Sequence, residues 1–158
     1  MIGSMVNIVG LISDTHGLLR PQAIEALKGS DVILHAGDIC GPEVLYALRQ
    51  IAPVVAVRGN NDRGEWARQL PDFEIFRAGD HSLFILHNLY DLPIDPAAAG
   101  CSAVISGHTH KPKIEEKRGV LWFNPGSAGP RRFQLPVTAG RLTFANGMLT
   151  PEIVSLEV

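Results

Sequence analysis

The amino-acid sequence predicts an α/β protein with two packed β-sheets, parallel early in the chain and antiparallel late. Near-continuous apolar runs alternate with helix-like segments in the first half, which is typical of parallel β-α-β units covered on both faces. Short apolar runs separated by Gly, Pro or Asn-Gly turns follow in the second half, which suits antiparallel strands. The chain has 158 residues, 46% of them apolar, which fits one domain over residues 1–158. Residues 1–4 are interpreted as an alternative start or a cloning remnant.

The first half is predicted to alternate strands with helices. Pro21 opens one helical segment and Gly29 ends it, because proline suits a first helical turn and glycine a stop. Pro42 opens another, in which apolar residues recur every three or four positions as far as Ile51. The expected elements are strand 6–12, helix 21–29, strand 32–35, a helix from residue 42, and strand 54–57.

The second half is predicted to be rich in strands and poor in helix. Only Pro96 to Ala99 hints at a helical turn, and Asn146-Gly147 is a good hairpin signal. The expected strands are 73–76, 83–86, 103–105, one at Ile114, 120–123, 137–138, 142–145 and 148–156.

Composition and charge exclude several classes of protein. The formal net charge is -2, from 14 basic and 16 acidic residues, so no strong field favours a nucleic acid polymer or an anionic membrane. No apolar run approaches the roughly 20 residues of a membrane helix. Cys40 and Cys101 form no C-x-x-C pair, which argues against a thiolate metal site and a secreted disulfide framework. We therefore expect a cytoplasmic protein, and leave a homo-oligomer open.

Side chains of the types that bind metals follow five of the predicted strands, where each strand ends. In open α/β sheets a ligand binds beyond the carboxyl ends of the strands, so residues almost a hundred positions apart can share one location. This regularity predicts one metal site. Its seven candidate ligands are Asp14, His16, Asp38, Asn60, His87, His108 and His110.

The local sequence suits such a crowded site. In an extended segment, residues i and i+2 project to the same side, so Asp14 with His16, and His108 with His110, can each aim two donors at one place. Three glycines each precede a candidate ligand and allow tight turns or a close backbone approach. They are Gly37, Gly59 and Gly107.

The donor set also indicates the kind and number of ions. Four imidazoles, two carboxylates and one carboxamide suit borderline divalent metals such as Mn, Fe, Zn or Ni. Seven ligands are too many for one tetrahedral zinc, but they serve two ions about 3.5 to 4 Å apart if Asp38 bridges them. Two such ions outweigh the two carboxylates and a bridging hydroxide, so the expected guest is an anionic phosphate ester.

The order of these motifs resembles the signature of calcineurin-like metallophosphoesterases. The motifs are Asp14-Thr15-His16, Gly37-Asp38, Gly59-Asn60-Asn61-Asp62, the isolated His87 and Gly107-His108-Thr109-His110. With its compact length and the later Asn124-Pro125-Gly126-Ser127, the chain is similar to the small YfcE-type phosphodiesterase branch from Met5 to Val158. This resemblance implies a four-layer α/β/β/α sandwich of two mixed sheets.

The resemblance further implies two metal positions that share one carboxylate. It assigns Asp14, His16 and His110 to the first ion, Asn60, His87 and His108 to the second, and Asp38 to both. Manganese is the implied metal, with Fe, Zn, Ni or Mg as alternatives.

The sequence departs from the wider family at two positions. Asn61 stands where many members place a histidine thought to protonate the leaving group, and Asn88 stands where glycine commonly follows the histidine ligand. A carboxamide is no useful general acid near pH 7, so the chemistry must rely on the metals, on water or on a good leaving group.

Other polar residues have structural interpretations as well as functional ones. His35 lies inside an apolar run, so we expect a hydrogen-bonded core histidine. His81 is expected to face solvent in a turn. Asp62 is expected to cap a helix or to orient Asn60, and Cys40 is expected to be packed.

Three arginines are candidates to bind phosphate oxygens, because a guanidinium makes bidentate contacts with such groups. Solvated surface arginine is the equal alternative for each. They are Arg58, Arg131 and Arg132.

We expect a hydrolase in which a dinuclear centre binds a small phosphodiester and a metal-bridging hydroxide attacks phosphorus in line. Asp38 and Asn61 are the expected catalytic residues. A phosphomonoesterase of the same fold is the alternative among enzymes. The other class is a non-catalytic protein-binding scaffold resembling the small retromer subunit, although competent residues at all seven ligand positions favour the enzyme.

Overall fold

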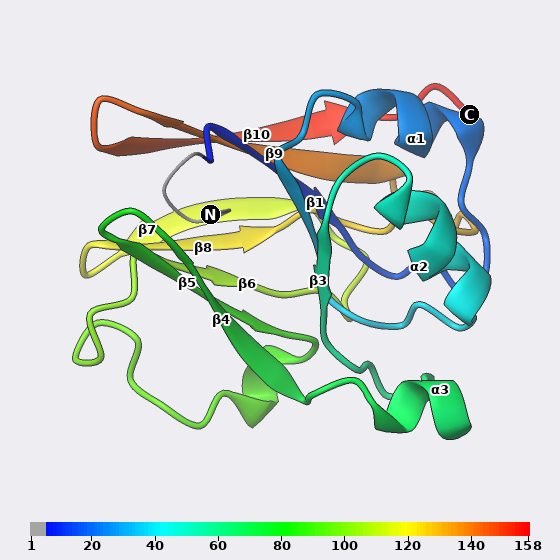
Figure 1. Cartoon of the computed structure of the whole chain (residues 1–158), viewed down its shortest axis with the longest axis horizontal. Coiled ribbons are helices and arrows are strands. Elements are labelled where there is room, and N and C mark those ends of the chain that lie inside the picture. The colour runs from blue at the N-terminus through cyan, green and yellow to red at the C-terminus, as the bar shows by residue number, and fades with distance from the viewer. Residues whose placement is uncertain (1–5) are drawn as a thin grey trace.

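The computed structural model describes residues 6–158 and contains two five-stranded sheets packed face to face (Figure 1). Each sheet has three neighbouring parallel strands and two antiparallel ones, which confirms the α/β class with two mixed sheets. Residues 1–4, interpreted above as a start or a remnant, lie outside the described residues.

The first sheet has the strand order β10-β9-β1-β2-β3. Its parallel strands are β1 (Ile8–Ile12), β2 (Val32–His35) and β3 (Val54–Ala56), and its antiparallel strands are β9 (Thr138–Ala145) and β10 (Met148–Ser155). The sequence predicted two separate strands where β9 is continuous. Gly140 joins them, and a Cβ there would lie 2.9 Å from Cζ of Phe123 in the other sheet, so the absent side chain lets the sheets approach.

The second sheet has the strand order β4-β5-β6-β8-β7. Its strands are β4 (Phe73–Ala78), β5 (His81–Leu86), β6 (Ala103–Ile105), β7 (Lys113–Lys117) and β8 (Val120–Asn124). The strands β5, β6 and β8 are parallel to one another. The expectation of antiparallel strands from residue 113 onward therefore holds for the pairing of β8 with β7 but not for its pairing with β6. The connection from β5 to β6 contains only the short 3-10 helix η1 (Leu89–Asp91), and the sequence therefore lacked the helical signal of a parallel crossover.

Helices cover the first sheet, and a mostly irregular segment covers the second. Figure 1 shows α1 (Pro21–Leu27) and α2 (Pro42–Arg49) together on one side of the molecule, and their apolar faces share a cluster with Ile12 and Ile33 of the first sheet. The short α3 (Glu65–Arg68) follows β3. On the outer face of the second sheet, Leu92 and Ile94 pack over Phe84. The fourth layer is thus thin, a coil with η1 and a turn.

Alternating side chains of the central strands fill the two sides of the first sheet. Val9 and Leu11 of β1 pack between the sheets, whereas Ile12 packs under the helices. Leu34 and Ile33 of β2 divide in the same way. Burial on both faces explains why these strands appear in the sequence as continuous apolar runs. The helices described in residues 6–158 include none long and apolar enough to cross a membrane.

Two histidines outside the candidate site show how well their sequence interpretations hold. His35 is fully buried at the end of β2, as expected. His81, expected in a solvent-facing turn, instead begins β5 and is half-buried, with Nδ1 2.8 Å from Ser102 Oγ and Nε2 3.0 Å from the Gly147 carbonyl oxygen. The turn expectation for His81 is wrong because two loops close over the start of this strand.

The hydrogen bonds of His35 require one neutral tautomer. Nδ1 of His35 accepts a hydrogen bond from the Gly37 amide at 3.1 Å. Nε2 lies 3.0 Å from the Thr15 hydroxyl, and that hydroxyl donates its own proton to the Ile39 carbonyl oxygen. Nε2 therefore carries the proton and donates to Thr15, and a second proton on Nδ1 would break the Gly37 contact. Burial lowers the pKa of His35 to about 3, although the charges of Asp14 and Asp38 oppose the shift.

The first prediction concerns acid stability. Because the pKa of His35 falls from 6.5 to about 3 on folding, the stability it contributes is complete above pH 6.5 and is lost as the pH falls toward 3. Metal-free wild type should therefore lose free energy of unfolding more steeply than His35→Gln below pH 6.5, by up to about 1.4 kcal/mol per pH unit. Urea unfolding from pH 7.5 to 5 measures both curves. Parallel curves would contradict a neutral buried His35.

Candidate metal centre

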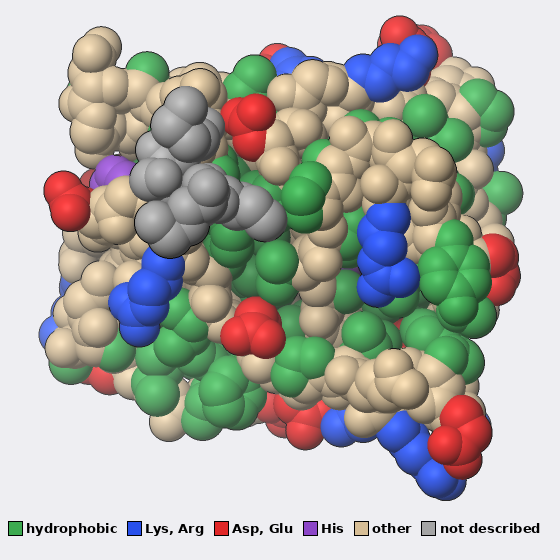
Figure 2. Space-filling view, in the orientation of Figure 1, with side chains coloured by type: hydrophobic (Ala, Val, Ile, Leu, Met, Phe, Trp, Pro, Cys, Tyr) green, Lys and Arg blue, Asp and Glu red, His purple; other side chains and the backbone are tan. Residues whose placement is uncertain are grey.

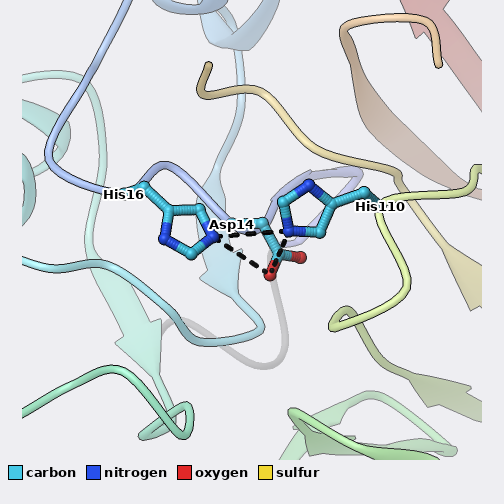
Figure 3. Close-up of side chains that lie close together, drawn as sticks. All are labelled: Asp14, His16 and His110. Carbon is cyan, nitrogen blue, oxygen red and sulfur yellow. Dashed lines mark hydrogen bonds and ion pairs between the residues drawn. The ribbon is translucent and has the colours of Figure 1, made fainter. Parts of the chain in front are cut away.

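Loops that follow β1, β2, β3, β5 and β6 bring the predicted ligands together. In the first group, from the loops after β1 and β6, His16, His110 and Asp14 face one another (Figure 3). His16 Nε2 lies 3.3 Å from His110 Nε2, and His110 Nε2 lies 3.4 Å from Asp14 Oδ1. These are the three side chains that the resemblance assigned to one ion.

A second group of candidate ligands consists of Asn60, His87 and His108. His108 Nδ1 is 3.2 Å from Asn60 Oδ1 and 3.3 Å from His87 Nε2. His87 is held from behind, since its Nδ1 is 2.8 Å from the Ala36 carbonyl oxygen and must donate to it. Nε2 of His87 is then the free nitrogen that points into the centre.

Asp38 lies between the two groups. Its Oδ2 is 3.7 Å from His16 Nε2 and 3.3 Å from His87 Nε2. Asp14 Oδ1 is also 3.9 Å from His87 Nε2, so both carboxylates face both groups. All seven predicted ligands thus converge in one place. His108 and His110, however, divide between the two groups instead of aiming at one point.

The backbone that presents these ligands is not extended, and the i, i+2 argument for their direction is wrong. Five ligands have left-handed backbone, a conformation uncommon for residues other than glycine and concentrated at functional sites. A left-handed residue turns the chain sharply, so neighbouring side chains point differently from those of a strand. The five φ angles are Asp14 55°, His16 46°, Asp38 57°, His108 73° and His110 65°.

The glycines before the ligands permit a close approach, as the sequence predicts. A Cβ on Gly107 would clash with Ser13 Oγ and lie 2.7 Å from Asp14 Oδ2, and a Cβ on Gly59 would clash with the Asp38 carboxylate. A Cβ on Gly37 would lie 2.8 Å from His87 Nδ1. Any side chain at these positions would displace a candidate ligand.

Asp14 provides a direct test of whether a cation fits. It is fully buried, and its Oδ2 accepts from the Ser13 hydroxyl at 2.7 Å and the His108 amide at 3.1 Å. Its Oδ1 has no hydrogen-bond partner within residues 6–158. A buried carboxylate oxygen without a donor is costly unless a positive charge compensates it. The donor set around Oδ1, imidazole nitrogens and a second carboxylate, fits a divalent metal ion.

The site keeps both carboxylates ionised. Burial alone would raise the pKa of Asp38, but the nearby His87 imidazole and hydrogen bonds from Asn61 hold that pKa well below its ordinary value. Burial likewise opposes ionisation of Asp14, and the nearby His110 imidazole and the hydrogen bond from Ser13 outweigh it, so its pKa is lowered. Burial also lowers the pKa of His16 against the pull of both carboxylates, which favours the neutral imidazole that a metal requires.

Asp62 joins two ligand loops and does more than the sequence predicts. Its Oδ2 accepts from the amides of Asp38 at 3.0 Å and Gly59 at 2.8 Å, and its Oδ1 accepts from the Cys40 amide at 2.8 Å. It caps no helix, because α3 begins after Gly64. The expectation of a helix cap is wrong. Asp62 instead supports the site by bonding to the backbone of the loops that carry Asp38 and Asn60.

The segment after β8 closes the centre from the side of β6. Asn124 Nδ2 donates to the Gly107 carbonyl oxygen at 3.0 Å, and the Ser127 hydroxyl donates to the Asp14 carbonyl oxygen at 3.0 Å. The sequence offered only a turn here, so the clamp on the Asp14 and His108 loops appears only in three dimensions.

Asn61 contacts Asp38 rather than open space. Its backbone amide donates to Asp38 Oδ1 at 2.8 Å and its side-chain Nδ2 donates to Oδ2 at 2.9 Å. Cys40 is also close, with Sγ 3.6 Å from His16 Nδ1. Burial raises the pKa of the Cys40 thiol to about 11, helped by nearby carboxylates, so it is a neutral neighbour of a candidate ligand.

The three arginines differ in their surroundings. Arg58 is engaged, because its Nε donates to Asp72 Oδ1 at 3.1 Å. Arg131 reaches the Leu135 carbonyl oxygen at 3.3 Å. Arg132 lines a hollow beside the centre, and its charge contributes to the lowered pKa of His16, so it is the best placed of the three for an anionic ligand.

Buried carboxylates, imidazoles and a carboxamide that follow the strands of two mixed sheets define the class of α/β proteins with a candidate metal centre. The sequence matches the family model of the calcineurin-like phosphoesterase superfamily domain over residues 8–147. The chain belongs to the calcineurin-like phosphoesterase superfamily. This membership confirms the predicted metal-dependent phosphoric ester hydrolase.

Two curated relatives agree with this membership. A probable metallophosphoesterase from Methanocaldococcus jannaschii is 35% identical over 133 residues, which cover 76% of this chain and 67% of the relative. Phosphodiesterase YfcE from Escherichia coli is 30% identical over 155 residues, covering 82% of this chain and 84% of the relative. The similarity to the YfcE branch is therefore confirmed.

Solved structures show the same architecture. An archaeal phosphodiesterase superposes with a TM-score of 0.78 at 27% identity, over 94% of this chain and 99% of that one. Vps29 from Chaetomium thermophilum superposes with a TM-score of 0.77 at 16% identity, over 95% and 97%. The Vps29 likeness, at this identity, concerns the fold alone.

The second prediction tests the loop contact of Asp62. In Asp62→Asn one carboxylate oxygen becomes an amide that faces a backbone N–H, so a buried donor loses its acceptor. We expect a loss of about 1–3 kcal/mol in the free energy of unfolding. Asp72→Asn is the matched control, since Asp72 is exposed and its ion pair with Arg58 should contribute under about 1 kcal/mol. Equal losses in chemical denaturation would refute the role of Asp62.

Proposed function

We propose that this chain hydrolyses a small phosphodiester at a centre of two divalent metal ions held by the seven converging side chains. The position of Asp38 carries this proposal, since its Oδ2 lies within 3.7 Å of a nitrogen from each ligand group. The unpartnered Oδ1 of the buried Asp14 supports it. Manganese as the metal, a cytoplasmic location and a homo-oligomer stay predictions.

The protein contributes to catalysis by keeping its carboxylates charged and its ligand side chains correctly oriented before the substrate binds. Asp14 and Asp38 supply negative charge that is ionised at neutral pH, and His87 is fixed by its bond to Ala36. When bound, two divalent ions lower the pKa of bound water toward roughly 7 and neutralise charge on the phosphate oxygens. Seven prealigned ligands need little reorganisation during the reaction, which is where much enzymatic rate enhancement arises.

The surroundings of Asn61 favour a diester with a good leaving group. Its amide group is committed to Asp38 Oδ2 and carries no titratable proton. A poor leaving group needs a proton in the transition state, and a carboxamide cannot supply one near neutral pH. Asn61 therefore acts on the reaction by positioning Asp38.

Two alternatives remain distinct from this proposal. A phosphomonoesterase would use the same centre, but its substrate would carry one ester group on the phosphate instead of two. A protein-binding scaffold like Vps29 has support from the shared fold. The intact ligand set and the resemblance to proteins named as phosphodiesterases favour the enzyme over the scaffold.

The third prediction concerns Asp38. Because Asp38 faces both ligand groups, Asp38→Ala should lose hydrolysis of bis(4-nitrophenyl) phosphate in Mn²⁺ by a factor on the order of 100 or more, while its circular dichroism spectrum stays that of wild type. Metal analysis of the purified proteins should show fewer ions bound. Asp80→Ala, an exposed acid in the β4-β5 turn, is the control. Full activity in Asp38→Ala would refute the shared ligand.

The fourth prediction concerns Asn61. Asn61→His adds a titratable donor for the leaving group, so hydrolysis of methyl phenyl phosphate, which releases phenol, should rise relative to that of bis(4-nitrophenyl) phosphate, which releases the better leaving group 4-nitrophenol, by on the order of tenfold or more. The kcat/KM values of both esters give this ratio. Asn61→Ala removes the contact with Asp38 without adding a proton donor, and it should lower both values together. An unchanged ratio in Asn61→His removes the argument that Asn61 restricts the chain to esters with a good leaving group.

A further inference from the structure

A cavity of about 530 Å³ opens directly beside the second ligand group. Asn60 and His87 form one wall, and Phe73, Leu86 and Pro93 form apolar parts of the rest. This volume lies in the range of small-molecule sites. Since Asn60 and His87 belong to both, the cavity adjoins the metal centre.

Phe73 is an aromatic face held open toward the cavity. Its side chain is about half exposed, at 48%, and its ring stacks on buried Phe84 with centroids 5.3 Å apart and planes inclined by 17°. The β4-β5 register pairs Phe73 with Leu86, the residue immediately before His87. The ring is therefore packed against Phe84, lies close to a candidate ligand, and lines the cavity with about half of its side chain exposed.

The segment that carries Phe73 is fixed to the ligand loop after β3. The Arg58 amide donates to the Pro71 carbonyl oxygen at 2.8 Å, and Arg58 Nε donates to the Asp72 carboxylate at 3.1 Å. Arg58 precedes Gly59 and Asn60, so these two contacts connect the segment that carries the ring to the ligand loop. A prearranged aromatic face binds a planar group at little cost in ordering.

The charge of the cavity excludes a second anion. Arg58 is neutralised by Asp72, and the cavity also contains Asp62 and Asp91. Because Asp62 is committed to backbone amides, the carboxylate of Asp91 is the acceptor that this lining offers to an uncharged group that donates hydrogen bonds. On the other flank of the centre, Arg132 and Lys111 line a hollow, so the cationic surface lies opposite. Away from the centre, Figure 2 shows basic and acidic side chains interspersed on the face it presents.

We infer that the cavity at Phe73 binds an uncharged planar heteroaromatic group of the substrate, such as a nucleobase, by stacking on the exposed face of the ring. Phe73 is then a specificity-determining residue, and the substrate class is an ester that carries a nucleoside. This inference rests on the proposed function, because the phosphate must be held at the metal centre for its arm to reach Phe73.

The experiment compares two phosphates that differ only in the base. Adenosine 5′-monophosphate and ribose 5-phosphate are titrated as competitive inhibitors of bis(4-nitrophenyl) phosphate hydrolysis in Mn²⁺. With wild type, adenosine 5′-monophosphate should inhibit more tightly. Phe73→Ala should raise its inhibition constant by about 5- to 100-fold, the effect of one lost base stack, and leave that of ribose 5-phosphate within about twofold.

Matched variants separate stacking from a change in fold. Phe73→Trp should keep or improve the preference for the base, whereas Phe73→Leu, which retains bulk but lacks a π-face, should lose most of it. Phe133→Ala removes an exposed aromatic from the cationic flank and should leave the preference unchanged. Equal inhibition of wild type by both phosphates, or a preference that follows Phe133 and survives Phe73→Ala, would overturn the assignment.

The failure of the proposed function would give a different result. If wild type with Mn²⁺ hydrolyses no diester, the two phosphates are titrated by calorimetry against the Mn²⁺-loaded protein. A Phe73-dependent preference for adenosine 5′-monophosphate would then support the cavity without the catalysis. Active wild type without any preference for the base would refute the cavity and leave the catalysis intact.

Discussion

Two buried carboxylates facing three imidazoles are the constraint on which the rest of the structure depends. Asp14 and Asp38 are almost fully buried and ionised. Burying two negative charges side by side is unfavourable unless other groups compensate them. Backbone amides, a hydroxyl and the Asn61 amide stabilise most of their oxygens, and Asp14 Oδ1 faces only imidazole nitrogens across the described chain. A bound cation completes this balance, so the site has a built-in affinity for metal.

The fold supplies the geometry at the place where the two sheets share a core. Each ligand loop is short and begins at the end of a buried strand, so packing between the sheets fixes the loop ends. Asp62 and Ser127 then connect neighbouring loops through backbone groups. The left-handed residues cost conformational energy, and these contacts offset it. Strain and support lie in the same few turns, which is typical of a site organised before its ligand binds.

The sequence predicted the location of the site better than its local geometry. Strand ends are visible because buried strands such as β1 are apolar throughout, and polar residues follow their ends. Residue type does not fix the left-handed backbone of Asp14 or His110, because aspartate and histidine are enriched in that conformation but most of them adopt others. The parallel pairing of β5 with β6 was missed since coil and η1 replace a crossover helix. The role of Asp62 depends on loops 24 residues apart, which only the folded chain brings together.

The absence of an imidazole at residue 61 and the cavity at Phe73 both concern how this chain can lower the activation free energy of the reaction. Without a proton donor near the leaving group, the chain's own contribution to rate is the alignment of the ester with the metal centre. A contact far from phosphorus lowers KM alone if it binds substrate and transition state equally. It raises kcat when it fixes the ester's orientation for in-line attack. Because Arg58 ties the Phe73 segment to the Asn60 loop, stacking at Phe73 can fix that orientation, and binding and alignment are one event.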